Sequence, residues 1–295
     1  RDSRIPTSSY KSIHLPYDHP HIYSEGRTGL DTVLHAREIY WPGTFLSLKF
    51  LGDSVSVTLE DQYGDNYFNV LVDDTLTEVL HLEQGKNTYV LATKLEAGEH
   101  RVELHKRNDW TYGWTRFYGF DLYGNASFPQ EPKDQFIEFY GNSITTGYGN
   151  EDYSGEDRPT GDVSNNYLAY GALTARNTES AYSCISHSGI GMMVSWHNLI
   201  MPEEYNRLNP AKAESLWDFS SRQPDIVVVN LLQNDSWLVE LPEHEQFIRR
   251  FGHTAPNSAH IIEGFVALLQ SLGGEYPDAE IICLLGNMDI TKEGS

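Results

Sequence analysis

From about Leu30 to Tyr123 the chain carries a hydrophobic pattern with a period of two. Apolar side chains alternate with polar ones within residues 46–50, 55–59, 68–72, 102–104 and 118–122. This alternation is typical of strands that bury one face. Gly52-Asp53 and Asp73-Asp74 are predicted to turn the chain between neighbouring strands. Several short strands at hairpin spacing predict an antiparallel sandwich of the jelly-roll type.

The pattern changes after Gly124. Residues 126–135, "ASFPQEPKDQ", are polar and contain two prolines, which predicts a linker. Apolar runs then alternate with helical periodicity, predicting strands over 136–141, 180–186, 225–232 and 279–285 and helices over 164–176 and 258–272. Gly273-Gly274 is predicted to end the second helix.

Strands that are apolar throughout and joined by helices indicate a parallel sheet covered on both faces. The sequence therefore predicts two domains. Residues 1–125 are expected to form an all-β jelly-roll sandwich, and residues 126–295 an α/β/α domain.

The composition of the chain disfavours some binding partners and some structural features. The net charge is −21, which disfavours binding to the phosphate backbone of nucleic acid. No window of about 18 apolar residues predicts a membrane span, and no signal peptide is visible. Cys184 and Cys283 lie in apolar runs, so we expect buried thiols rather than a disulfide.

Candidate chemistry gathers where three of the predicted parallel strands end. Ser143 follows the first strand, Gly189 the second and Asn234 the third, at intervals of 46 and 45 residues. Parallel strands bring their carboxyl ends to one edge of the sheet, where ligands bind in α/β proteins. A hydroxyl, a backbone N–H and a carboxamide are the groups that acyl transfer needs, namely a nucleophile and donors to an oxyanion. The G-x-S-x-G elbow is absent, because Thr145 stands where its second glycine would be.

These residues resemble the first three signature positions of the SGNH (GDSL-like) hydrolases. "YGNSITTGYGN" is similar to the variant found in carbohydrate esterase family 2. "YWPGTFLSLKF", "YFNVLVD" and "GEHRVELHKR" resemble that family's jelly-roll segments.

The resemblance implies a serine esterase that removes acetyl groups from xylan or related plant polysaccharides, outside the cytoplasm, without a metal or organic cofactor. Ser143 would be the nucleophile. The N–H groups of Ser143 and Gly189 and the side chain of Asn234 would be the oxyanion donors.

The sequence departs from the family at several positions. Asn142 stands where aspartate is common, and Leu232-Gln233 replaces a glycine and a small residue before Asn234. The histidine base is expected in a later D-x-x-H-like motif, beyond Ser295, so we expect residues 126–295 to lack the end of the domain.

The histidines that are present have other expected roles. His187, His197 and His253 are interpreted as packing or surface residues. His19 and His21 have a metal-like spacing, but no acidic or cysteine partner accompanies them, so no metal site is predicted.

Trp196 and Trp237 follow the second and third strands and are candidates for stacking on sugar rings, with core packing as the alternative. Two rival functions stay open. One is an SGNH esterase for other small or lipid esters, and the other is a non-catalytic glycan-binding protein. The sequence does not indicate the sugar or the oligomeric state.

Overall fold

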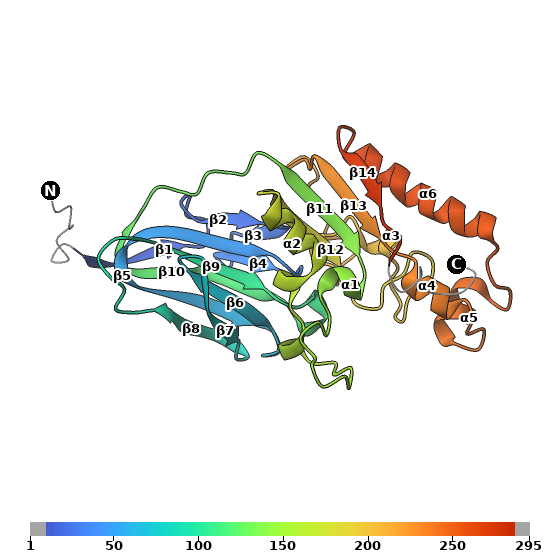
Figure 1. The fold of residues 1–295 in the computed structure, drawn as a ribbon, viewed down its shortest axis with the longest axis horizontal. Helices are drawn as coiled ribbons and strands as arrows, with labels where there is room; N and C mark the ends of the chain where they lie inside the picture. Colours follow the sequence, from blue (N-terminus) through green and yellow to red (C-terminus); the bar gives the residue numbers. More distant parts are fainter. Residues whose placement is uncertain (1–9, 287–295) are drawn as a thin grey trace. The chain divides into compact units, whose positions relative to one another are not determined.

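The computed structural model describes residues 10–286, whose contacts form two compact units. The first unit comprises residues 10–132 and Gly149–Tyr167, and the second comprises Lys133–Tyr148 and residues 168–286 (Figure 1). Within these described residues, no helix has the length and apolar character needed to cross a membrane.

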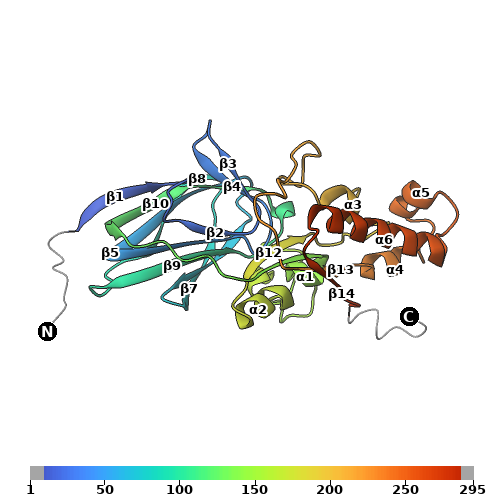
Figure 2. The same cartoon turned by 90° about the horizontal axis from the view of Figure 1, so that it is seen from above.

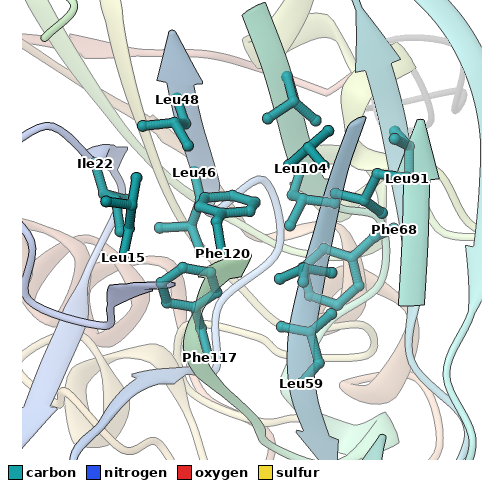
Figure 3. Close-up of a cluster of buried hydrophobic side chains, with 14 of the residues drawn as sticks. Leu15, Ile22, Leu46, Leu48, Leu59, Phe68, Leu91, Leu104, Phe117 and Phe120 are labelled. Atoms are coloured by element: carbon teal, nitrogen blue, oxygen red, sulfur yellow. The ribbon is translucent and has the colours of Figure 1, made fainter. Parts of the chain in front are cut away.

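The first unit is an antiparallel β structure. Its described strands are β1 (Lys11–Pro16), β2 (Tyr23–Glu25), β3 (Thr28–Asp31), β4 (Ala36–Ile39), β5 (Phe45–Asp61), β6 (Tyr67–Val72), β7 (Thr75–His81), β8 (Gly85–Ala92), β9 (Glu99–Lys106) and β10 (Thr115–Ala126). They follow the order β3-β4-β10-β5-β9-β6-β7, with β1 on β10 and with β2 and β8 on β5. The inward side chains form one apolar cluster, in which Phe68, Phe117 and Phe120 are fully buried (Figure 3).

The predicted turn at Gly52-Asp53 is wrong, because β5 runs through it as one strand. The apolar series nevertheless changes phase there, from Leu46 and Leu48 to Val55 and Val57, and the pairing with β10 shifts register at Tyr123/Gly124. A Cβ on Gly52 would lie 2.5 Å from the carbonyl oxygen of Tyr123. This glycine therefore permits a bulge between two strands rather than a turn.

A second bulge changes which side of β10 is buried. Tyr118 was expected on the inner face, but Phe117 is buried there and Tyr118 is only half-buried. The register with β5 shifts between Phe117 and Gly119, and Gly119 has φ +147°. The bulge inserts one extra residue, so the alternation of inward and outward side chains reverses there. The sequence pattern therefore placed Tyr118 on the wrong face of β10.

The segment Gly149–Tyr167 belongs to the first unit by its contacts. Arg107 is buried and holds this segment by donating to the carbonyl oxygens of Ser164 (3.1 Å) and Asp162 (2.9 Å). The guanidinium also pairs with the carboxylate of Glu151. This buried cation thus helps to order a stretch whose helical content is the 3₁₀ turn Gly161–Val163 and the start of a second one, Asn166–Leu168.

The second unit is α/β with a parallel sheet. Its strands, in the order β12-β11-β13-β14, are β11 (Phe136–Gly141), β12 (Ala181–Ser186), β13 (Ile226–Asn230) and β14 (Glu280–Cys283). Its helices are α1 (Ser143–Thr146), α2 (Tyr170–Asn177), α3 (Met201–Glu204), α4 (Gln233–Leu238), α5 (Glu245–Phe251) and α6 (Ser258–Glu275) (Figure 2).

Alternate residues of β11 face opposite sides of this sheet. Ile137 and Phe139 pack in one cluster with Ala172 of α2. Glu138 points the other way and accepts a hydrogen bond (2.8 Å) from the hydroxyl of Tyr276, directly after α6. The sheet is therefore covered on both faces, as the apolar runs predicted, and buried Glu138 is accommodated by hydroxyl donors.

Two helix boundaries differ from the prediction. α2 begins at Tyr170 rather than 164, because the backbone N–H of Asn165 bonds to Asn150 (3.0 Å) and that of Asn166 to Arg107 (2.8 Å). α6 continues through Gly273-Gly274 to Glu275. Gly273 lies 3.8 Å, measured from an ideal Cβ position, from the side chain of Ile281, so it serves helix–strand packing rather than termination.

The predicted linker and one of the two predicted buried thiols agree with the structure. Residues 127–135 contain no helix or strand, in agreement with the predicted linker. Cys184 is buried as expected, whereas Cys283 is exposed, and both are free thiols. Cys283 lies on β14, which among the described strands pairs only with β13, so its thiol is not enclosed.

Candidate active site

The register of the parallel sheet brings the three candidate reacting groups to one edge. Gly141, the last residue of β11, pairs with Ser186 of β12 on one side and with Asn230 of β13 on the other. Ser143, Gly189 and Asn234 follow these three paired positions by two, three and four residues. All three therefore lie at the carboxyl edge of adjacent strands, with Ser143 on the central one.

The turn that presents Ser143 is held by local contacts. Asn142 is the N-cap of α1, and its side chain accepts a hydrogen bond (3.1 Å) from the backbone N–H of Ile144. Ser143 is the first residue of α1 and is partly exposed. Gly147 ends α1 in the left-handed conformation (φ +80°) and donates to the carbonyl of Ser143 (2.9 Å). A Cβ on Gly141 would lie 1.9 Å from Thr145 Oγ1, so the tight strand-to-helix turn requires glycine there.

The loop after β12 places Gly189. The residue has φ +82°, a conformation that favours glycine, and its carbonyl accepts from the N–H of Trp196 (3.0 Å). Two residues later, a Cβ on Gly191 would lie 1.9 Å from the carbonyl oxygen of Val194. A side chain is therefore disfavoured at Gly189 by backbone conformation and excluded at Gly191 by the close approach of the backbone.

A carboxylate from α4 holds this loop. The side chain of Asp235 accepts three hydrogen bonds from consecutive backbone N–H groups, those of Met192 (2.7 Å), Met193 (2.6 Å) and Val194 (3.0 Å). Burial raises the pKa of Asp235, while these N–H groups act in the opposite direction by favouring the charged form. Asp235 therefore fixes the shape of the loop that carries Gly189.

The side-chain amide of Asn234 has a fixed orientation. Its Nδ2 donates to the carbonyl of Ile190 (2.7 Å), and its Oδ1 accepts from the indole N–H of Trp196 (3.1 Å). Exchanging the oxygen and nitrogen would place like groups opposite each other, so both contacts select one orientation. Because Nδ2 carries two hydrogens, the bond to Ile190 leaves a second N–H for an oxyanion.

Two departures from the family pattern have clear structural positions. Leu232 precedes α4 with φ +85°, so a β-carbon occupies a conformation that glycine adopts without strain. Gln233 is buried, and its amide contacts those of Asn142 and Asn230. Since Gln233 meets Asn142 directly, a neutral pair of amides connects α4 with the N-cap of the serine turn.

Both candidate stacking residues are about two-fifths exposed. Trp196 has 41% of its surface accessible and Trp237 has 42%. The Trp196 ring also meets His244 edge-to-face, with centroids 5.3 Å apart. Trp196 thus has a positioning contact with Asn234 in addition to an exposed face.

The histidines near this edge are engaged in packing. His187 is buried, its Nδ1 lies 3.0 Å from a carboxylate oxygen of Glu204, and its ring stacks on His197 at 3.8 Å. His253 is exposed. The histidine expected beyond Ser295 lies outside the described residues. Among the described residues, no group of three or more His, Cys, Asp or Glu side chains has an arrangement suited to a metal ion.

Sequence reasoning located the three strand ends but missed the anchoring role of Asp235 and the steric need for Gly191. The only signal for Asp235 was its position next to Asn234, since its partners lie more than 40 positions earlier in the chain.

Comparison with known proteins adds independent information. The family model described as "Carbohydrate esterase 2 N-terminal" matches residues 25–132. The chain is 31% identical over 277 residues to "Cellulase/esterase CelE" of Acetivibrio thermocellus, covering 92% of this chain and 32% of that protein. It is 30% identical over 240 residues to an "Acetylxylan esterase / glucomannan deacetylase" of Cellvibrio japonicus, covering 78% of this chain and 64% of that protein.

A solved structure is similar over most of its length. The family two carbohydrate esterase from Clostridium thermocellum, solved in complex with cellohexaose, superposes with a TM-score of 0.80 at 30% identity. The superposition covers 90% of this chain and 77% of that one. The chain spans about a third of the first curated relative and less than two thirds of the second.

Proposed function

This chain belongs to carbohydrate esterase family 2, and we propose on that premise that it is a serine esterase that removes acetyl groups from plant polysaccharides such as xylan or glucomannan. The observation that carries the proposal is the oriented amide of Asn234 at the same sheet edge as Ser143 and Gly189. The name of the Cellvibrio relative supports the choice of substrate.

In the proposed mechanism, Ser143 Oγ attacks the carbonyl carbon of a sugar-bound acetyl group. The electron pair of the carbonyl moves onto its oxygen, and the negative charge is stabilised by N–H groups of Ser143, Gly189 and Asn234. Collapse of this intermediate releases the sugar hydroxyl and leaves an acetyl group on Ser143. Water then attacks the acetyl-enzyme, and acetate leaves through a second intermediate of the same kind.

The attack requires a base that takes the proton of the Ser143 hydroxyl and returns it to the departing sugar oxygen. The family resemblance assigns this role to the histidine of a D-x-x-H-like motif. We propose that Trp196 and Trp237 offer their exposed indole faces to the sugar rings next to the scissile acetyl group, because planar aromatic surfaces suit the C–H face of a pyranose.

The proposal extends to the organisation of the chain. A jelly-roll domain over residues 1–125 and a catalytic domain from residue 126 are supported by the antiparallel strands that end at Ala126 and by the irregular segment that follows. A location outside the cytoplasm is proposed because polysaccharide substrates are found there. The proposed function needs neither nucleic acid nor a metal.

The decisive experiment replaces the nucleophile in the full-length protein. Ser143→Ala is expected to reduce acetate release from acetylated xylan and glucomannan by about 10³-fold or more, with an unchanged melting temperature. Ser236→Ala is the matched control, because it removes a hydroxyl on α4 that donates to the carbonyl of Gln233 (2.9 Å) and belongs to none of the proposed reacting groups. Its activity should stay within about threefold of the parent.

Other outcomes would contradict specific parts of the proposal. A clear preference for butyrate or longer acyl esters would remove the carbohydrate assignment. Binding of polysaccharide without acetate release, unaffected by Ser143→Ala, would indicate a glycan-binding protein instead.

A further inference from the structure

The antiparallel unit contains a hollow of about 780 Å³ that takes no part in the proposed catalysis. Its floor is formed where β1, β10, β5 and β8 lie side by side. Pro16 pairs with Gly119, Gly119 with Thr58, and Thr58 with Thr88 of β8. Of these residues, Pro16 and Thr58 line the hollow.

Gly119 lets β1 and the ring of His14 approach β10 closely beside the hollow. A Cβ at this position would lie 2.3 Å from the carbonyl oxygen of Leu15 and 2.9 Å from the ring of His14. The missing side chain lets the His14 imidazole lie on β10, where its Nδ1 is 2.8 Å from a carboxylate oxygen of Asp121. The bulge at this glycine also places Tyr118 in the lining rather than in the core.

The hollow has a wall that is already ordered. The turn between β3 and β4 is closed by Asp31, whose Oδ1 accepts from the N–H groups of Val33 (2.9 Å) and Leu34 (2.8 Å). Leu34 and His35 from this turn line the hollow, and the His35 ring lies 6.2 Å from that of Tyr17. A preformed wall lowers the entropic cost of binding a ligand.

The lining matches a neutral ligand with many hydroxyl groups. Lys86 places its ammonium 3.3 Å from the centre of the Tyr118 ring, and the Tyr118 hydroxyl donates to Glu60 (2.6 Å). Asp18 adds a carboxylate and Thr58 a hydroxyl, so the hollow offers both donors and acceptors with charges of both signs. Sugar hydroxyls donate and accept, whereas an anion would meet Asp18 and a chain carrying a net charge of −21.

Shape and apolar contacts agree with this chemistry. Pro16 and Leu34 provide apolar surface beside the polar groups, which suits the C–H face of a sugar ring. The volume lies within the range of pockets that hold organic ligands rather than single ions. We propose that this hollow is a second saccharide-binding site that takes a neutral oligosaccharide, built from residues other than those of the candidate active site.

The test compares two members of one threonine pair. Thr58 and Thr88 share a hydrogen bond (2.9 Å) across β5 and β8, but only Thr58 lines the hollow. Thr58→Tyr and Thr88→Tyr each remove that bond and add the same β-favouring side chain. Only the first places the larger side chain at a position that lines the hollow.

Binding of unacetylated xylohexaose and cellohexaose would be measured by calorimetry in a Ser143→Ala background that also carries Trp196→Ala and Trp237→Ala, which removes the proposed sugar-stacking residues of the active site. We expect dissociation constants of about 0.1–1 mM for the parent and Thr88→Tyr, and at least about tenfold weaker binding for Thr58→Tyr. Cleavage of a small aryl acetate, measured with Ser143 intact, should be equal in all three proteins. This second readout separates a failure of the site from a failure of the proposed esterase function.

Equal affinities of Thr58→Tyr and Thr88→Tyr would overturn the proposal, as would the absence of binding to the parent at millimolar sugar. If Thr58→Tyr does not fold, His14→Ala replaces it, with Ser12→Ala on the same strand as control. A loss of affinity in His14→Ala alone supports the site, and no difference between these two variants refutes it.

Discussion

Two loops of this protein are each held by one buried charged side chain, and the two anchors work differently. Asp235 holds the loop of Met192–Val194 through three consecutive backbone N–H groups. Arg107 holds the segment Gly149–Tyr167 through the carbonyl oxygens of Ser164 and Asp162 and an ion pair with Glu151. The charge of Asp235 is compensated by peptide dipoles, whereas the charge of Arg107 is compensated largely by the carboxylate of Glu151.

The difference relates to what each loop does. The Asp235 loop carries Gly189, so the direction of its peptide groups matters, and three N–H bonds to one carboxylate fix three successive peptides. Arg107 fixes a segment that contains none of the proposed reacting groups. We therefore expect Asp235 to govern activity and stability together, and Arg107 to govern stability alone.

Among the variants that test this comparison of two anchors, the largest effect is expected from Asp235→Ala. Three buried N–H groups lose their acceptor, so the free energy of unfolding should fall by about 3 kcal/mol and acetate release by about a hundredfold. Chemical denaturation and steady-state kinetics measure the two effects. Asp218→Ala is the control, because this exposed carboxylate also accepts a backbone N–H (3.0 Å, from Ser220) but in a solvated turn. An Asp235→Ala enzyme with near-normal turnover would show that the loop keeps its shape unaided.

Arg107→Met should lower the free energy of unfolding by about 3 kcal/mol, because it leaves the buried side of Glu151 and two carbonyl groups without their cation. Turnover per folded molecule should stay within about twofold. Arg158→Met, which removes a partly exposed guanidinium that pairs with Asp152 and Asp162 in the same segment, should cost less than about 1 kcal/mol. A large loss of turnover in Arg107→Met would contradict the expectation that Arg107 affects stability but not activity.

Trp196→Phe separates positioning from sugar stacking. The phenyl ring keeps an aromatic face but loses the N–H that bonds to Asn234 Oδ1, so kcat should fall about fivefold with little change in KM. Trp237→Phe does not alter the hydrogen bond to Asn234, so this variant should change KM more than kcat. The two variants would be compared on acetylated xylan, and identical kinetic profiles would contradict a separate role for Trp196.

The smallest effect is expected from Leu232→Gly. Removing the β-carbon from a left-handed residue should raise the free energy of unfolding by about 1 kcal/mol. Glu179→Gly, at φ +55° in an exposed turn of the same unit, is the reference for relief of backbone strain alone. Destabilisation by Leu232→Gly together with stabilisation by Glu179→Gly would mean that the packing of Leu232 outweighs its strain.

The sequence predicted the strands of the parallel sheet well, because each apolar run carries its own signal. β11 has the predicted bounds, and β12 and α6 begin within one residue of the predicted position. The errors fall where a distant partner intervenes. Gly52 was interpreted as a turn because its neighbour Tyr123, 71 positions away in the chain, was invisible to a local pattern.

The order of Ser143, Gly189 and Asn234 and the parallel sheet that gathers them were determined by the sequence itself, since strand periodicity and turn glycines are local properties. Only the tertiary structure decided how the groups are oriented. The amide of Asn234 is directed by Ile190 and Trp196, and the Gly189 loop is shaped by Asp235. Hydrogen bonds between segments 38 to 44 residues apart leave no periodic trace in the chain, because they depend on the register of strands and not on neighbouring residues.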